Sequence, residues 1–287
     1  MLNIDLHCHS NVSDGVLSPS EVVARAAANG VDILALTDHD DVAGLTVARA
    51  AAATTPLTLI PGVEISVSWR GQTVHIVGLR IDPDHPELAA GLHGIRLGRI
   101  ERAHRMADDL ARHGIVGAYD GADGYAANKQ MVGRTHFARW LVAQGHAPDI
   151  RTAFKRFLTR GHPGYVEHQW TTLENAVGWI RASGGTAVIA HPGRYAFKRH
   201  ELLELVNEFR TLGGEGIEVI TGSHHPSEYG KFADLARAFS LKASRGADFH
   251  APGEGVDIGR LPDLPHYCQP VWHQWPELAQ HPTVTFA

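Results

Sequence analysis

The stretch that decides the fold is Asn3-Ile4-Asp5-Leu6-His7-Cys8-His9-Ser10. It predicts a first β-strand over residues 3–9 that ends in a His-x-His pair. Side chains at positions i and i+2 of a strand point to the same face, so His7 and His9 project together. Two imidazoles placed in this way suit a first-row divalent metal ion. Asp14 follows five residues later in a Ser-Asp-Gly turn and adds an oxygen ligand.

The length and composition are those of an ordinary globular protein. Its 287 residues suffice for a large α/β barrel or for one domain with an insertion, and 44% of them are hydrophobic. No apolar run or secretory pattern indicates a membrane, so no membrane partner is expected. Cys8 and Cys268 are the only cysteines, which predicts no disulfide framework and fits a reducing cytoplasm.

Strand and helix signals alternate along most of the chain. Strands are predicted at residues 3–9, 31–36, 57–69, 73–79, 186–190, 216–220 and 241–243. Helices are predicted from residue 18 to about 30, then to about 53, and over 172–183, 198–212 and 227–239. Ser18 and Glu21 form a capping box, and Thr171 with Glu174 gives a second start signal. Polar residues follow the strands, which favours a barrel with its site on one face.

Residues 87–160 break this alternation, because they read as helical throughout. The sequence therefore predicts a barrel built from residues 1–86 and 161–287, with an inserted helical lid subdomain at 87–160. Residues 95–160 hold 12 Lys and Arg against 6 Asp and Glu, in a chain of net charge −5. This local basic excess predicts an anion site rather than a stable nucleic-acid complex.

Nine side chains that can ligate a metal lie at or beside the predicted strand ends. They are His7, His9, Asp14, His39, Glu64, His75, His191, Asp248 and His250. Six imidazoles and three carboxylates exceed the needs of one ion. They suit two or three divalent ions that share bridging groups.

The motifs around these residues resemble those of the PHP (polymerase and histidinol phosphatase) family, in the family's order. They are His7-Cys8-His9-Ser10, Ser13-Asp14-Gly15, Thr37-Asp38-His39-Asp40, Gly62-Val63-Glu64-Ile65, His75, His191-Pro192-Gly193 and Asp248-Phe249-His250. The helical insertion after His75 is similar to the branch with nucleoside 3′,5′-bisphosphate phosphatases and a 5′→3′ exoribonuclease.

The resemblance implies a distorted (β/α)7 barrel of the PHP type and a trinuclear metal centre. The implied ligand sets are His7, His9, Glu64 and Asp248 for one ion, Glu64, His75 and His191 for the second, and Asp14, His39 and His250 for the third. Asp14 departs from family members that have histidine there. The harder oxygen ligand favours manganese, with iron or zinc as alternatives.

Charge favours phosphate chemistry at such a centre. Three divalent ions would carry about +6 and the three carboxylates about −3, leaving about +3 for a phosphomonoester dianion. Asp248 is predicted to be a catalytic residue as well as a ligand. His224 is the candidate general acid that gives a proton to the leaving oxygen, and it is also a candidate contact to substrate. Asp38 and Asp40 are predicted to orient ligands or cap helices.

Substrate selection is predicted to lie mainly in the insertion. Gly133 begins a helix whose first turn combines backbone N–H groups with a guanidinium. The candidate substrate-binding residues are Lys129, Arg134, Thr135, His136, Arg102, Arg105, Arg194 and His224. Arg99 shares the three-residue spacing of Arg102 and Arg105. A metallic and a basic phosphate region together predict a nucleoside 3′,5′-bisphosphate that loses its 3′-phosphate, with the 5′-phosphate under the lid.

Four alternatives remain open. The nearest is a 5′→3′ exoribonuclease on short 5′-phosphorylated RNA, gripped by the same basic lid. Histidinol phosphate phosphatase would leave the basic insertion with little purpose, because its substrate has one phosphate. A metal-dependent amidohydrolase also has His-x-His on a first barrel strand, but the charge surplus weighs against a neutral amide. A structural metal-binding module needs four ligands rather than nine.

Overall fold

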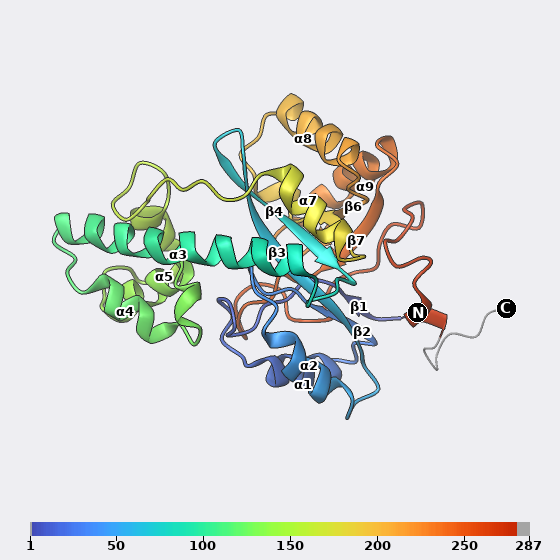
Figure 1. Ribbon diagram of the computed structural model, residues 1–287, viewed down its shortest axis with the longest axis horizontal. Coiled ribbons are helices and arrows are strands. Elements are labelled where there is room, and N and C mark those ends of the chain that lie inside the picture. Colours follow the sequence, from blue (N-terminus) through green and yellow to red (C-terminus); the bar gives the residue numbers. More distant parts are fainter. Residues whose placement is uncertain (1, 280–287) are drawn as a thin grey trace.

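The computed structural model describes residues 2–279, which form a nearly closed seven-stranded α/β barrel (Figure 1). The strands follow one another in chain order: β1 (Ile4–Asp5), β2 (Ile33–Leu36), β3 (Thr58–Trp69), β4 (Gln72–Leu79), β5 (Thr186–Ile189), β6 (Gly216–Thr221) and β7 (Lys242–Gly246). Strand β4 is antiparallel to both neighbours, and the other pairs are parallel. The edges meet where Leu6 N–H donates to Arg245 O at 3.0 Å.

Helices surround the sheet and build the insertion (Figure 1). They are α1 (Pro19–Ala28), α2 (Gly44–Ala52), α3 (Pro86–Arg112), α4 (Ala118–Tyr125), α5 (Arg134–Ala143), α6 (Ile150–Ala153), α7 (Leu173–Ala182), α8 (Arg199–Thr211), α9 (Tyr229–Ala238) and α10 (Pro276–Ala279). Short 3-10 turns lie at η1 (Lys129–Met131), η3 (Pro192–Arg194) and η4 (Pro226–Glu228), and η2 (Phe154–Leu158) is a π-helical turn.

The local signals in the sequence explain where several elements begin. The hydroxyl of Ser18 accepts from the N–H of Glu21, whose carboxylate accepts from the N–H of Ser18, so the predicted capping box is confirmed. Arg70 and Gly71 have positive φ angles of 47° and 72° and turn β3 into β4. A long hairpin thus carries Glu64 and His75 on paired strands.

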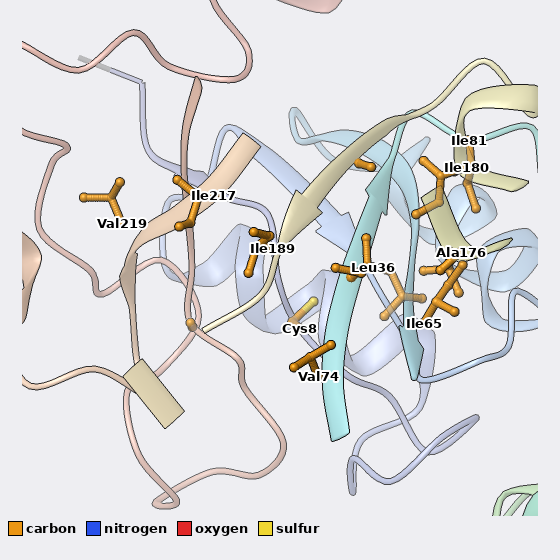
Figure 2. Close-up of a cluster of buried hydrophobic side chains, with 14 of the residues drawn as sticks. Cys8, Leu36, Ile65, Val74, Ile81, Ala176, Ile180, Ile189, Ile217 and Val219 are labelled. Carbon is orange, nitrogen blue, oxygen red and sulfur yellow. The ribbon is translucent and has the colours of Figure 1, made fainter. Parts of the chain in front are cut away.

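Both faces of the sheet are apolar, as a barrel wrapped by helices requires. One face packs against the helices, where Ile65 of β3 lies near Ala176 of α7 (Figure 2), and Ile189 and Ile217 belong to the same cluster. The other face forms the barrel interior and is covered by Trp275 from the C-terminal segment. The interior cluster includes Ile4, Leu6, Ile33, Ala35, Ile60, Val77, Leu79, Val188 and Ala190.

Helix α3 connects the barrel to the other inserted helices (Figure 1). Leu88 and Leu92, near its start, belong to the barrel cluster, whereas Met106 and Leu110 belong to a separate cluster shared with α4 and α5. A second core of this kind supports the proposed lid subdomain, with the first turns of α3 anchored on the barrel.

Several elements differ from the sequence prediction. Strand β1 spans only Ile4–Asp5, because the N–H of Leu6 donates to Arg245 O and that of Cys8 donates to the hydroxyl of Thr37, so neither continues the ladder with β2. Strand β7 runs on to Gly246, paired with β6. Thr172 rather than Thr171 caps α7, and α10 lies in a tail predicted as irregular. Among the described residues, no helix combines the length and apolar composition that a bilayer span requires.

Candidate metal centre

Every strand of the barrel except β6 contributes to one cluster, from a residue that follows the strand or, in the β3–β4 hairpin, from within it. His7 and His9 follow β1, His39 follows β2, Glu64 lies in β3, His75 lies in β4, His191 follows β5, and Asp248 and His250 follow β7. Asp14 joins them from the turn after β1. In this turn a Cβ at Gly15 would lie 2.5 Å from the carbonyl oxygen of His9, so only glycine fits.

Glu64 lies at the middle of the cluster. Its Oε1 is 3.0 Å from Nδ1 of His75 and 2.9 Å from Nε2 of His191, and its Oε2 is 2.9 Å from Nδ1 of His39. Nε2 of His7 and Nε2 of His9 are 3.1 Å apart and both lie 3.4 Å from Oε2. A carboxylate that reaches so many imidazoles has the geometry of a bridging ligand.

Asp14 anchors the other side of the cluster. Its Oδ1 lies 3.2 Å from Nε2 of His250 and 3.9 Å from Nε2 of His39. The ring of His9 stacks on that of His250 at 4.2 Å. Ligand atoms within 4.8 Å of one another form four overlapping groups, and these together contain all nine predicted ligands.

Burial and neighbouring charges shift the pKa values of these groups in different directions. Burial lowers the pKa of His9 to about 3, helped by His250 and His39, and burial with Arg194 lowers that of His191 to about 3. For His250, burial is outweighed by Asp14, which raises the pKa to about 9. For Glu64, burial is outweighed by imidazoles, first His39, which hold the pKa well below its usual range. Ionised carboxylates and neutral imidazoles are the forms that bind divalent ions.

Two carboxylate oxygens give a test of whether the residues fit metal ions. Oδ1 of Asp14 and Oδ1 of Asp248 are buried and accept no hydrogen bond of normal geometry from the described residues. Each has a partner oxygen, Oδ2, that is hydrogen-bonded: Thr135 donates to Asp14 and Ser223 donates to Asp248. A buried anionic oxygen without a donor requires a cation. The donor set therefore fits a centre of divalent ions.

Glu218 is a site residue that the sequence reasoning missed. It lies in β6, is 1% exposed, and its Oε1 is 2.8 Å from Nδ1 of His7. Its Oε2 accepts the backbone N–H of His191 at 2.6 Å. This contact fixes the tautomer of His7 and leaves Nε2 free for a metal ion. An acid inside the apolar strand Gly-Ile-Glu-Val-Ile was the available signal.

The two aspartates beside His39 support the cluster as predicted. Asp38 accepts hydrogen bonds from the hydroxyls of Ser10 and Ser13, both at 2.6 Å, and so holds the turn that carries Asp14. Asp40 accepts from Ser66 and from the guanidinium of Arg99. Asp40, His191 and Asp248 have positive φ angles of 46°, 26° and 54°. Left-handed non-glycine residues of this kind concentrate at functional sites.

Two connected cavities open from the cluster. The smaller, about 100 Å³, is lined by the ligands Asp14, His39, His75 and His250 among others, and the larger, about 520 Å³, lies beyond it. Five residues line both cavities, namely Thr73, Arg102, Arg134, Trp170 and Arg194. A ligand that spans the two cavities would therefore pass three guanidinium groups.

The guanidinium groups of Arg134 and Arg102 are suited to an anion. Arg134 lies over the ring of Phe154 at 5.8 Å, and Arg102 lies over Trp170 at 5.3 Å. Burial, reinforced by the charge of Arg134, lowers the pKa of Arg102 to about 9. Arg194 donates to Oδ2 of Asp248 at 3.0 Å and is half exposed. Crowded cations in a cavity favour an anionic ligand.

Other predicted substrate contacts lie elsewhere. Lys129 bonds to Asp123 on the surface, and His136 accepts the N–H of Gly133 inside its own helix start. Arg105 lies near Glu101 outside both cavities. Nε2 of His224 accepts the N–H of Gly193 at 2.9 Å, a contact with backbone rather than with the cluster. Their local partners, which sequence spacing does not reveal, direct these side chains away from the cavities.

A family model described as PHP domain matches residues 5–222. The chain belongs to the PHP domain family. The resemblance drawn from the motifs is therefore confirmed, and so is the barrel of PHP type.

Curated relatives of this PHP domain protein match over almost the full chain. It is 54% identical over 275 residues to a 3′,5′-nucleoside bisphosphate phosphatase from Chromobacterium violaceum, covering 96% of each chain. It is 42% identical to the 5′-3′ exoribonuclease Rnm of Escherichia coli, covering 94% of this chain and 93% of that one. A solved structure of an amidohydrolase from C. violaceum, with bound sulfate and no metal, matches with TM-score 0.92 and 55% identity over 94% of each chain.

Proposed function

We propose that this protein is a metal-dependent phosphatase that removes the 3′-phosphate of nucleoside 3′,5′-bisphosphates and releases a nucleoside 5′-monophosphate. The observation that carries the proposal is the pairing of a multi-ligand cluster with a basic cavity that opens from it. The 54% identical relative has the same named activity. The scissile phosphate would lie at the cluster and the second phosphate beside Arg134 and Arg102.

The charge of the centre supports a phosphate ester over a neutral amide. Glu218 adds a fourth carboxyl group beside the three predicted ones. With three divalent ions, the surplus is about +2 when Glu218 is ionised. That value matches a phosphomonoester dianion, whereas an amide substrate would leave it uncompensated.

When bound, divalent ions would supply Lewis acidity toward the phosphoryl oxygens and lower the pKa of water. The nine predicted ligands would hold them, with Glu64 shared between positions. Arg194, beside Asp248, is placed to donate hydrogen bonds to the same phosphate. Arg134 and Arg102 would fix the far end of the substrate, which aligns the scissile group.

The inserted helices would also close the site. Thr135 and Arg134, at the start of α5, line the smaller cavity opposite His39 and His75. A bound substrate would therefore be enclosed between the barrel and the lid, which limits access of bulk water.

Manganese fits the mixed nitrogen and oxygen ligands, and two or three ions fit the overlapping groups.

A reducing cytoplasm would keep Cys8 and Cys268 as the thiols that the structure shows.

The second candidate is a 5′→3′ exoribonuclease, named for the 42% identical relative. The larger cavity, about 520 Å³ and open at its rim, favours it by leaving room for more than one nucleotide. In this reading Arg134 and Arg102 would hold the terminal 5′-phosphate of an RNA.

One incubation separates the two functions. Purified protein with Mn²⁺ is given adenosine 3′,5′-bisphosphate or a short 5′-phosphorylated RNA, with Asp248→Ala as the inactive control. The proposal predicts faster release of inorganic phosphate from the bisphosphate. Faster release of successive mononucleotides from the RNA would contradict it, as would equal turnover by Asp248→Ala.

A further inference from the structure

The lid helix α5 reaches directly to a predicted metal ligand. The hydroxyl of Thr135 donates to Oδ2 of Asp14 at 2.8 Å, and Nη1 of Arg139 donates to the backbone oxygen of Asp14, also at 2.8 Å. These residues are four apart and lie on the same face of α5. Asp14 is thus held by two side chains that belong to the insertion.

This arrangement leaves one oxygen of Asp14 for a cation. Oδ2 is occupied by Thr135, whereas Oδ1 is buried without a hydrogen bond of normal geometry from the described residues. Oδ1 lies 3.2 Å from Nε2 of His250. Rotation of the carboxylate would break the bond to Thr135, so that bond fixes the direction of Oδ1.

We propose that Thr135 and Arg139 are positioning residues of the Asp14–His39–His250 metal position, so that the docked lid completes it. The inference rests on the proposed metal centre and goes beyond the proposed reaction. Asp14 lies in a turn, not in a strand, and a turn needs such restraint to present a ligand.

The same contact argues against Thr135 as a direct donor to substrate. A threonine hydroxyl has one proton to donate, and here it is donated to Asp14. The role that the sequence predicted for Thr135, a contact to substrate, would need that bond to break.

A thermodynamic consequence follows from the shared contact. If the docked lid orients Asp14, an ion at this position stabilises the docked lid by the same coupling free energy. A contact of the lid to a residue that is not a predicted ligand does not share this property. Asn128, for example, donates to Oδ2 of Asp41 at 2.9 Å, which is not a predicted ligand.

The test is a calorimetric titration with Mn²⁺ in the absence of substrate. The variant Asp14→Ala first identifies which class of Mn²⁺-binding sites in the titration depends on Asp14. Thr135→Val, which keeps the shape and removes the donor, is expected to weaken that same class about tenfold, the effect of losing a support to a metal ligand. Arg139→Gln tests the second contact and is expected to weaken the same class.

Two controls separate orientation of Asp14 from general loosening of the lid. Thr135→Ser keeps the hydroxyl and is expected to retain the wild-type affinity. Asn128→Ala removes a lid contact away from Asp14 and is expected to leave this class unchanged. Unaltered Mn²⁺ affinity in both Thr135→Val and Arg139→Gln would overturn the inference. It would also be overturned if these variants weakened a class of Mn²⁺ sites that Asp14→Ala leaves intact. Phosphate release is measured separately, so this failure would leave the proposed reaction standing.

Discussion

Glu218 shows how one buried carboxylate can organise two ligands. Its two oxygens bond to Nδ1 of His7 and to the N–H of His191, which follow β1 and β5. His191 has a φ of 26°, a conformation that a non-glycine residue keeps only when its surroundings hold it. Glu218 therefore joins three strands of the barrel at the point where the ligands converge.

We expect Glu218→Gln to weaken Mn²⁺ binding about 10- to 100-fold, the usual cost of losing such a support. The amide that replaces the carboxylate can donate to Nδ1 of His7, which would place the ring proton on the metal-facing Nε2. Calorimetric titration measures the loss. Glu215→Gln, which removes an equal charge from the surface pair with Lys242, is the matched control. Equal Mn²⁺ affinity in the two variants would refute the role of Glu218.

At the scale of elements, the C-terminal segment holds α1 against the barrel. Nε and Nη2 of Arg25 in α1 each donate to the carboxylate of Asp257 at 2.7 Å. Side-chain exposures of 33% and 32% mean that water screens this pair. Its contribution to stability is therefore modest, below about 1 kcal/mol.

The hydrogen bond from Arg25 lowers the pKa of Asp257, which gives the pair a defined pH dependence. A carboxyl with a depressed folded-state pKa stabilises the fold above its unfolded pKa, and this stability is lost as the pH falls through the folded value. Asp257→Asn should therefore lower Tm by at most about 2 °C near pH 7 and have little effect near about pH 3. Thermal melts at both pH values check this. A larger difference in acid than at neutral pH would contradict the account.

The sequence predicted which side chains form the cluster better than it predicted where individual strands end. The nine predicted ligands gather in one cluster because most of them follow strands that end at the same side of the barrel, and Glu64 and His75 reach it from within the β3–β4 hairpin. The length of β1 could not be predicted, since Thr37 takes the N–H of Cys8 through a long-range contact. Glu218 was missed because β6 carries no ligand motif. The sequence predicted that Lys129 and His136 bind substrate. In the structure they bond to local partners, Asp123 and the N–H of Gly133, and these contacts form only once the chain is folded, so the sequence does not reveal them.

At the scale of the whole molecule, function depends on how the barrel and the insertion meet. The barrel supplies the predicted ligands, and α3 and α5 supply Arg102 and Arg134 across the connected cavities. The ring of Trp170, in the return from the insertion to α7, is contacted by the guanidinium of Arg99 at 4.7 Å and by that of Arg102 at 5.3 Å. A substrate that reaches from the cluster to the insertion would therefore pass cationic side chains of both parts.

The most direct test compares kcat/KM for adenosine 3′,5′-bisphosphate and adenosine 3′-monophosphate in wild type and Arg134→Ala. We predict that wild type prefers the bisphosphate about 10- to 100-fold, the value of a hydrogen bond to a charged group. Arg134→Ala should lose most of this preference and keep its turnover of the monophosphate, while the control Arg105→Ala should match wild type. Equal kcat/KM for the two substrates in wild type, or an undiminished preference in Arg134→Ala, would contradict a substrate held at two phosphates.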